Sequence, residues 1–248
     1  MTKINQLIKD WPKGTIKTVK ELNELGYTSQ LLKIYSNSKW IELYGRGMYK
    51  LHGDTVTWEG ILCGMQRKSK TTLHAGGKTA LTLKGYGHYL HTEKNKIYLF
   101  SDSTENFNAW LKKNDQLLLK RNEVFDYSNK NYFINYNTGN FEILISSPEL
   151  AIMEMLYLVP LEQSFDEAFK IMEGLTTLRS KVCQGLLETS KSFKVKRLFL
   201  YMAEKNRHSW LKELNLEKVN LGSGKREIVK NGTLDKKYHI TVPRDYAE

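Results

Sequence analysis

The sequence predicts an α+β fold in which an N-terminal winged helix-turn-helix precedes a larger mixed α+β domain. Two observations predict the winged helix. Two short amphipathic helices are separated by Gly26-Tyr27, and two alternating strands are joined by Gly45-Arg46-Gly47. A third observation predicts the second domain, because apolar spacing changes from strand-like to helical at about Ser147. We expect the winged helix to span residues 1–54 and the α+β domain to span 55–248.

Each element of the winged helix has its own signal. The apolar spacing of Ile4, Leu7, Ile8 and Trp11 predicts a first helix, which Pro12 ends. The second carries an apolar stripe at three-residue spacing, Val19, Leu22 and Leu25. Gly26 then supplies the left-handed backbone that a sharp helix end needs. Thr28 or Ser29 caps the third helix, at about residues 29–36, whose expected packing residues are Leu31, Leu32, Ile34 and Tyr35.

This arrangement indicates DNA binding. In a helix-turn-helix, the second helix of the motif enters the major groove with its N-terminal residues toward the base edges. The wing then brings a cation to the flanking phosphates or minor groove. The residues expected to contact DNA are Thr28, Ser29, Gln30, Lys33, Lys39, Arg46 and Lys50. Two short helices and a hairpin also occur in domains that bind protein, so that alternative stays open.

The second domain is expected to begin mainly as sheet. A short helix carries Trp58, Ile61, Leu62 and Met65, and a Gly-rich turn leads into another helix that runs to Leu83. The expected strands are 71–74, 96–100, 116–120, 132–134 and 141–145. Four helices are expected to follow, at about 147–158, 164–174, 182–187 and 195–202. Ser147 is the expected cap of the first of them, and Pro148 takes its first helical position. The last expected strands are 219–221, 226–229 and 239–242.

Composition limits the class of protein. The 248 residues carry a net charge of +11, and 40% of them are hydrophobic, which suffices for a core. Residues 1–54 hold nine Lys/Arg against five Asp/Glu (+4), residues 55–178 hold thirteen against fourteen (−1), and residues 179–248 hold sixteen against eight (+8). Two basic ends favour polyanionic or acidic partners.

The same composition indicates a cytoplasmic protein. Cys63 and Cys183 are far apart in sequence, which fits a reducing compartment and excludes a disulfide framework. The N-terminus has no apolar stretch of signal-peptide length, and no apolar run approaches the ~18 residues of a membrane span.

Several residue strings, in order along almost the whole chain, resemble one known family. Tyr35, Trp40, Gly45-Arg46-Gly47 and Tyr49 resemble the N-terminal winged helix of AbiEi-type antitoxins. The middle and C-terminal segments of that family are similar to residues 76–81, 85–90, 147–151, 172–175, 194–200 and 221–226. The resemblance implies the antitoxin of a type IV (AbiE) toxin–antitoxin pair, associated with abortive phage infection. It implies autorepression, with the winged helix bound to inverted repeats in the promoter, and neutralisation of a nucleotidyltransferase-like toxin through the C-terminal domain.

A second basic region lies in the C-terminal domain. Lys194 and Arg197 are three residues apart and share one helix face, and the expected patch comprises Lys191, Lys194, Lys196, Arg197, Lys225 and Arg226. One interpretation is an anion-binding surface for DNA, RNA or an acidic toxin face. The other is an ordinary solvated helix face. The patch also supports an alternative function, a protein- or RNA-binding module whose basic surface masks a toxin or its substrate.

Other motifs argue against an enzyme. The turns at 76–79 and 222–226 lack the spacing of a phosphate loop, and we expect ordinary turns there. His74, His88 and His91 have no good further ligand beside them except Glu93, so packed or surface histidines are expected rather than a zinc site. No GxSxG or HExxH motif and no paired catalytic carboxylates occur. We therefore expect no catalytic residue, cofactor or metal.

Overall fold

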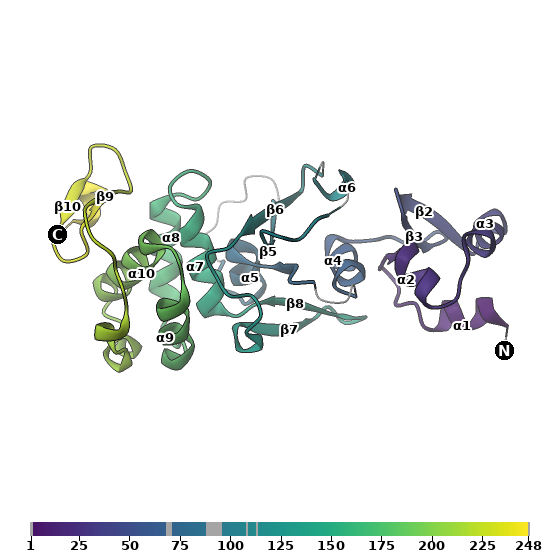
Figure 1. Cartoon of the computed structure of the whole chain (residues 1–248), viewed down its shortest axis with the longest axis horizontal. Helices are drawn as coiled ribbons and strands as arrows, with labels where there is room; N and C mark the ends of the chain where they lie inside the picture. The colour runs from purple at the N-terminus through teal and green to yellow at the C-terminus, as the bar shows by residue number, and fades with distance from the viewer. Residues whose placement is uncertain (1, 68–70, 88–95, 108, 113, 248) are drawn as a thin grey trace. The chain divides into compact units, whose positions relative to one another are not determined.

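The computed structural model describes residues 2–67, 71–87, 96–107, 109–112 and 114–247 (Figure 1). The chain divides into two compact units. The first comprises residues 1–75, 99–121 and 135–145, and the second comprises residues 76–98, 122–134 and 146–248. The domain boundary predicted after residue 54 stays a prediction. None of the described helices combines the length and apolar character that a membrane span requires.

The N-terminal segment has the predicted helices and hairpin, in the order α1 (Lys3–Lys9), β1 (Lys17–Thr18), α2 (Val19–Glu24), α3 (Ser29–Asn37), β2 (Ile41–Gly45) and β3 (Met48–Leu51). The hairpin strands are antiparallel and α3 packs beside β2 (Figure 1). The two-residue strand β1, which pairs with the outer edge of β3, was not predicted. It is too short to show a period in the sequence.

Hydroxyl caps and one apolar cluster hold these helices in place. The Thr18 hydroxyl accepts the Glu21 N–H at 3.1 Å, and the Thr28 hydroxyl accepts the Leu31 N–H at 3.3 Å. Thr28 is therefore the cap of α3. The buried cluster comprises Leu7, Trp11, Leu22, Tyr27, Leu32, Tyr35 and Ile41. Two residues expected to pack there do not: Leu25 and Ile34 are 57% and 52% exposed. Three-residue spacing is too coarse to separate the edge of an apolar stripe from its centre.

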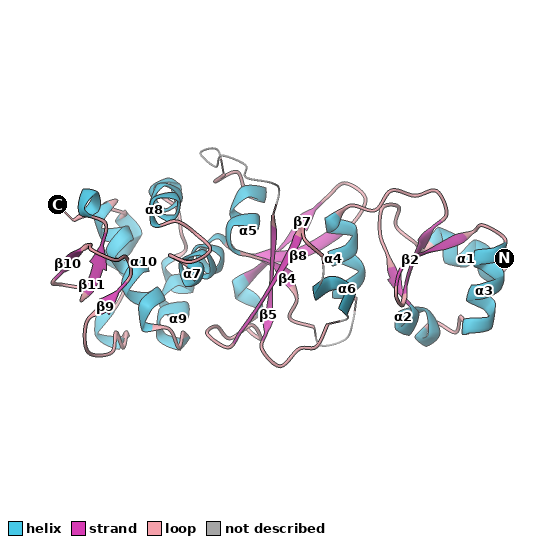
Figure 2. Ribbon diagram, turned by 90° about the horizontal axis from the view of Figure 1, so that it is seen from above, coloured by secondary structure: helices cyan, strands magenta, loops and turns pink. Residues whose placement is uncertain are grey.

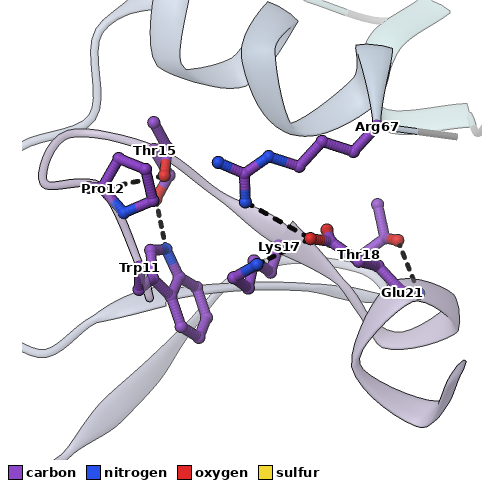
Figure 3. Close-up of polar contacts among 7 residues, drawn as sticks. All are labelled: Trp11, Pro12, Thr15, Lys17, Thr18, Glu21 and Arg67. Carbon is purple, nitrogen blue, oxygen red and sulfur yellow. Dashed lines mark hydrogen bonds and ion pairs between the residues drawn. The ribbon is translucent and has the colours of Figure 1, made fainter. Parts of the chain in front are cut away.

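Helix α4 (Trp58–Gln66) packs closely against the segment that leads into β1. The Ile16 N–H donates to the Gly60 carbonyl at 3.4 Å, and Arg67, just after α4, reaches Glu21 of α2 at 3.3 Å. The same Glu21 oxygen lies 2.7 Å from Lys17 Nζ, so one carboxylate joins two cations (Figure 3). The side chain of Gln66, the last residue of α4, donates to the Leu73 and Leu144 carbonyls and accepts from the Leu144 N–H.

A mixed five-stranded sheet follows, with the strand order β6-β5-β4-β8-β7. Its strands and short helices are β4 (His74–Ala75), β5 (Ile97–Asp102), α6 (Ala109–Lys112), β6 (Leu117–Asn122), η1 (Lys130–Tyr132), β7 (Phe133–Asn137) and β8 (Glu142–Ser146). The strand predicted at 71–74 is shorter and later than expected. Thr71 and Thr72 instead bond the Glu105 carboxylate, which takes the place of a strand partner.

Among its described residues, the second unit has the α-helices α5 (Gly77–Leu83), α7 (Pro148–Leu158), α8 (Phe165–Gly174), α9 (Ser180–Thr189) and α10 (Phe193–Lys205). Helices α8, α9 and α10 pack against α7, which is buried along nearly its whole length (Figure 2). Ser147 precedes α7 as predicted, but its hydroxyl makes no capping bond. Ser147 is fully buried, and its N–H donates to the Tyr132 carbonyl.

The tail holds short elements: η2 (Ser209–Glu213), η3 (Leu216–Lys218), β9 (Arg226–Glu227), β10 (Thr233–Asp235), β11 (Ile240–Val242) and η4 (Arg244–Tyr246). A strand predicted at 219–221 is absent, because that segment bonds side chains of α10 rather than another strand. Strand β10 was missed, and it pairs antiparallel with β11 while β9 pairs parallel with it.

Candidate nucleic-acid interface

The outward face of α3 carries the polar residues predicted to meet DNA. Ser29, Gln30 and Lys33 are all exposed on this helix, and the exposed Thr28 caps it. Leu32 and Tyr35 point into the core from the opposite side. Ser29, Gln30 and Lys33 therefore do not pack in the core, as a helix that enters a groove requires. Their contact with DNA stays a prediction.

The wing presents Arg46 at its tip. Arg46 is exposed between Gly45 and Gly47, and Gly47 has a φ of 76°, a left-handed conformation that side chains resist. The Gly47 carbonyl accepts the Val19 N–H at 2.9 Å, which ties the tip to the start of α2. The turn is thus anchored through its backbone while the Arg46 side chain projects outward.

An aromatic residue from a distant segment braces the base of the wing. Trp110 of α6 lies 5.6 Å from Tyr44, centroid to centroid. A Cβ at Gly45 would come within 3.2 Å of the Trp110 ring. Sequence reasoning missed this contact, because no local pattern joins residue 110 to a hairpin more than sixty positions earlier.

Two further predicted contacts differ in their surroundings. Lys39 is exposed and adopts a φ of 57°, in the turn between α3 and β2. Lys50 is half-buried, and its Nζ lies 2.6 Å from Glu42 Oε1 and 2.6 Å from the Asp54 carbonyl. The hydrogen bond from Lys50 is the largest cause of the lowered pKa of Glu42. Lys50 is thus committed to partners within the protein, which corrects its predicted role as a phosphate contact.

The expected C-terminal basic patch is largely internal. Lys196 and Arg197 are only 3% and 2% exposed. The Arg197 guanidinium donates to the carbonyls of Leu221, Gly222, Gly224 and His239 at 2.7 to 3.2 Å. Burial is the main cause that lowers the pKa of Arg197, with Arg226 adding repulsion. Both residues organise the loop that follows η3 and form no open anion-binding surface.

Lys194 is also used within the fold. Its Nζ donates to the carbonyls of Tyr157 and Val159 at 2.7 and 2.6 Å, at the C-terminal end of α7. A cation there satisfies carbonyls that the helix leaves open. Burial lowers the pKa of Lys194. The prediction of an open basic patch fails for Lys194, Lys196 and Arg197 for one physical reason. Helix periodicity shows which residues share a face, but it does not show what covers that face.

Three predicted basic residues remain on the surface. Lys225 is exposed in the loop that Arg197 holds, and Arg226 is exposed at the start of β9, where its guanidinium lies 5.5 Å from the Phe193 ring centre. Lys191 is exposed and forms a solvent-screened ion pair with Glu123 at 3.7 Å. Of the residues expected in the C-terminal basic patch, those that are exposed are therefore Lys191, Lys225 and Arg226.

The described residues considered as phosphate or metal ligands form contacts within the protein instead. At the Gly-rich turn, the Gly77 N–H donates to Oε2 of the fully buried Glu154 at 2.9 Å, so a side chain of the protein occupies the start of α5. His74 is buried, bonds the Thr72 carbonyl and stacks on Phe100. His88, His91 and Glu93 lie outside the described residues. Within the described ranges, no three His, Cys, Asp or Glu side chains gather as a metal site would require.

Two family models match this sequence. The model described as "Transcriptional regulator, AbiEi antitoxin, Type IV TA system" matches residues 94–243. A second model, "Transcriptional regulator, AbiEi antitoxin N-terminal domain", matches residues 1–92. The chain belongs to the AbiEi antitoxin family. The resemblance predicted from the residue strings is confirmed, and so is the classification as an antitoxin and transcriptional regulator of a type IV toxin–antitoxin system.

A solved structure has the same fold as this AbiEi family member. The "Crystal structure of RV2827C protein from Mycobacterium tuberculosis" is similar with a TM-score of 0.64, covering 96% of this chain and 88% of that chain. The two sequences are 10% identical, so the similarity shows the fold alone. The predicted α+β fold is confirmed. No curated protein matches the sequence.

Proposed function

We propose that this AbiEi family member is a cytoplasmic DNA-binding antitoxin that represses its own operon through the N-terminal winged helix. The observation that carries the proposal is the pairing of an outward polar face on α3 with an exposed arginine at the wing tip. The family's description as a transcriptional regulator supports it. The expected target is double-stranded DNA with inverted repeats in the promoter.

The polar face suggests a division of contacts. Ser29 and Gln30 present hydrogen-bonding groups from the first turn of α3, where a recognition helix meets base edges. Lys33 follows one turn later, and Arg46 reaches the phosphates or minor groove beside it. Lys39 adds sequence-independent attraction. Each phosphate that these cations neutralise releases counterions, so affinity must fall steeply with salt.

A second part of the proposal concerns the toxin. We infer that the surface cations Lys191, Lys225 and Arg226 contact the acidic partner of the antitoxin, which is a nucleotidyltransferase-like toxin or that toxin's nucleic-acid substrate. The observation in favour is the Arg197 clamp: its guanidinium holds three carbonyls of the loop that leads to the exposed Lys225 and Arg226, which keeps that loop in a fixed shape. A rigid loop loses little conformational entropy on binding.

The test is a gel shift with the full chain and DNA from upstream of its own gene, titrated with salt. A scrambled duplex of the same composition is the control. Tight binding to the upstream DNA alone, weakening as salt rises, supports an operator reader. Equal binding to both duplexes would refute sequence-specific repression. The complete chain is the right material, because α4 packs against β1 and a cut after residue 54 would divide that contact.

The toxin arm needs a separate measurement. The chain and the adjacent toxin gene are expressed together, and growth is compared for wild type and a Lys191→Ala, Lys225→Ala, Arg226→Ala triple variant. We expect the triple variant to lose protection while it keeps operator binding. Full protection by that variant would place neutralisation elsewhere on the chain.

A further inference from the structure

Ile34 is an apolar side chain on the face of α3 that carries the proposed DNA contacts. It is 52% exposed. It lies four residues after Gln30 and three before Asn37, and residues at these spacings are neighbours on one helix face. Lys33 is the adjacent exposed residue. The core-facing residues Leu32 and Tyr35 lie on the other side of the helix.

In the free protein, Ile34 leaves about half of its surface in water in the middle of this helix. Its β-branched side chain forms helix less readily than alanine or leucine. The helix has Leu32 and Tyr35 for its core contacts and needs no third anchor on this side. Exposure together with a place among the proposed DNA contacts distinguishes Ile34 from Leu25, which is as exposed but lies beyond the end of α2.

The inference rests on the proposed function and deepens it. The major groove offers one apolar group at its base edges, the C5 methyl of thymine. The occupant of this face is DNA rather than protein because three exposed cations of the motif, Lys33, Lys39 and Arg46, match phosphates. We propose that Ile34 contacts a thymine methyl in each operator half-site and is a specificity-determining residue.

The contact has a direct chemical test. Replacing thymine by uracil removes the C5 methyl and leaves base pairing unchanged. Operator duplexes with single thymine-to-uracil changes are titrated with the full chain by fluorescence anisotropy. For wild type, we expect one thymine per half-site at which the change weakens binding about four-fold, the loss that burial of one methyl-sized group predicts. Other thymines should give no change.

The Ile34→Ala variant then assigns that methyl to its partner. It should bind the normal operator more weakly than wild type and show no further loss with uracil at the sensitive position. Leu25→Ala is the matched control, because Leu25 is an equally exposed apolar residue of the same segment that lies beyond the end of α2. It should keep wild-type affinity and wild-type sensitivity to uracil.

Two results would overturn the inference while the proposed function stands: specific binding by wild type with no uracil-sensitive position, or a uracil effect as large in Ile34→Ala as in wild type. If Ile34→Ala lowers affinity equally for every duplex, Ile34 acts in protein–protein contact between bound copies and the methyl contact is wrong. Failure of the wild-type chain to distinguish the operator from scrambled DNA would overturn the proposed function itself.

Discussion

Gly60 lies so close to Gly14 that a Cβ added at Gly60 would come within 1.7 Å of the Gly14 carbonyl oxygen. One turn later, a Cβ at Gly64 would be 2.4 Å from the Ile16 carbonyl oxygen. Helix α4 therefore meets the segment leading into β1 backbone to backbone, along a seam that only glycine permits. This seam, with the Arg67–Glu21 ion pair, connects α4 to the winged helix.

The seam predicts an unusual response to alanine. Alanine normally stabilises a helix interior by about 1 kcal/mol relative to glycine. Gly60→Ala should instead lower the free energy of unfolding by ~1–3 kcal/mol, because backbone must move to make room. Gly174→Ala is the control, since its added Cβ meets only the Tyr86 side chain at 3.9 Å. Urea denaturation measures both, and an unchanged or raised midpoint for Gly60→Ala would disprove the tight contact.

The Arg197 clamp makes a second prediction. Arg197→Met keeps most of the side-chain volume and removes the donors to the Leu221, Gly222 and Gly224 carbonyls of the loop after η3. Because buried carbonyls without donors are costly, we expect a loss of ~3–5 kcal/mol in unfolding free energy. The exposed neighbour substitution Lys225→Ala should change it by less than about 0.5 kcal/mol. Similar stabilities for the two variants would show that the carbonyls find water instead.

Acid should weaken the fold through Glu149. Burial raises the pKa of this carboxyl, but hydrogen bonds from the Arg179 side chain and backbone N–H outweigh burial and leave the pKa lowered. A folded pKa below the unfolded one gives stability that is present above about pH 4.3 and is lost as pH falls through the folded pKa.

Glu149→Gln tests that linkage. The variant should lose ~1–3 kcal/mol at pH 7, and its stability should depend less on pH between about 5 and 3 than that of wild type. Glu123→Gln is the control, because Glu123 forms an exposed pair with Lys191 and its replacement should change the unfolding free energy at pH 7 by less than about 0.5 kcal/mol. Parallel profiles for Glu149→Gln and wild type would contradict the assignment.

The winged helix predicts distinct effects for three cations. Lys33→Ala and Arg46→Ala should each weaken operator binding by ~1–3 kcal/mol if they contact bases, and less if they contact phosphates alone. If Arg46 binds a phosphate, Arg46→Ala should also reduce the salt slope by about 0.9. Lys50→Ala should change neither quantity, since Lys50 is paired with Glu42. A large effect at Lys50 with none at Lys33 and Arg46 would reverse the proposed orientation.

Local chemistry in the sequence predicted much of the fold. The hydroxyl cap Thr28, Pro148 at the start of α7, and the Gly45-Arg46-Gly47 turn all act within a few residues of themselves. Such signals depend on backbone bonds and φ preferences near each residue, so they survive without knowledge of distant contacts. The ordered strings along the chain were enough to predict the family.

Tertiary structure decided which faces are covered. Ile34 was expected inside and lies outside, whereas Lys196 and Arg197 were expected outside and lie inside. Periodicity marks the residues that share a face, but burial depends on what packs there from far along the chain. For Arg197, that partner is a loop some twenty-five residues later, whose backbone carbonyls accept hydrogen bonds from the guanidinium. The free energy of these hydrogen bonds offsets the cost of removing the guanidinium from water.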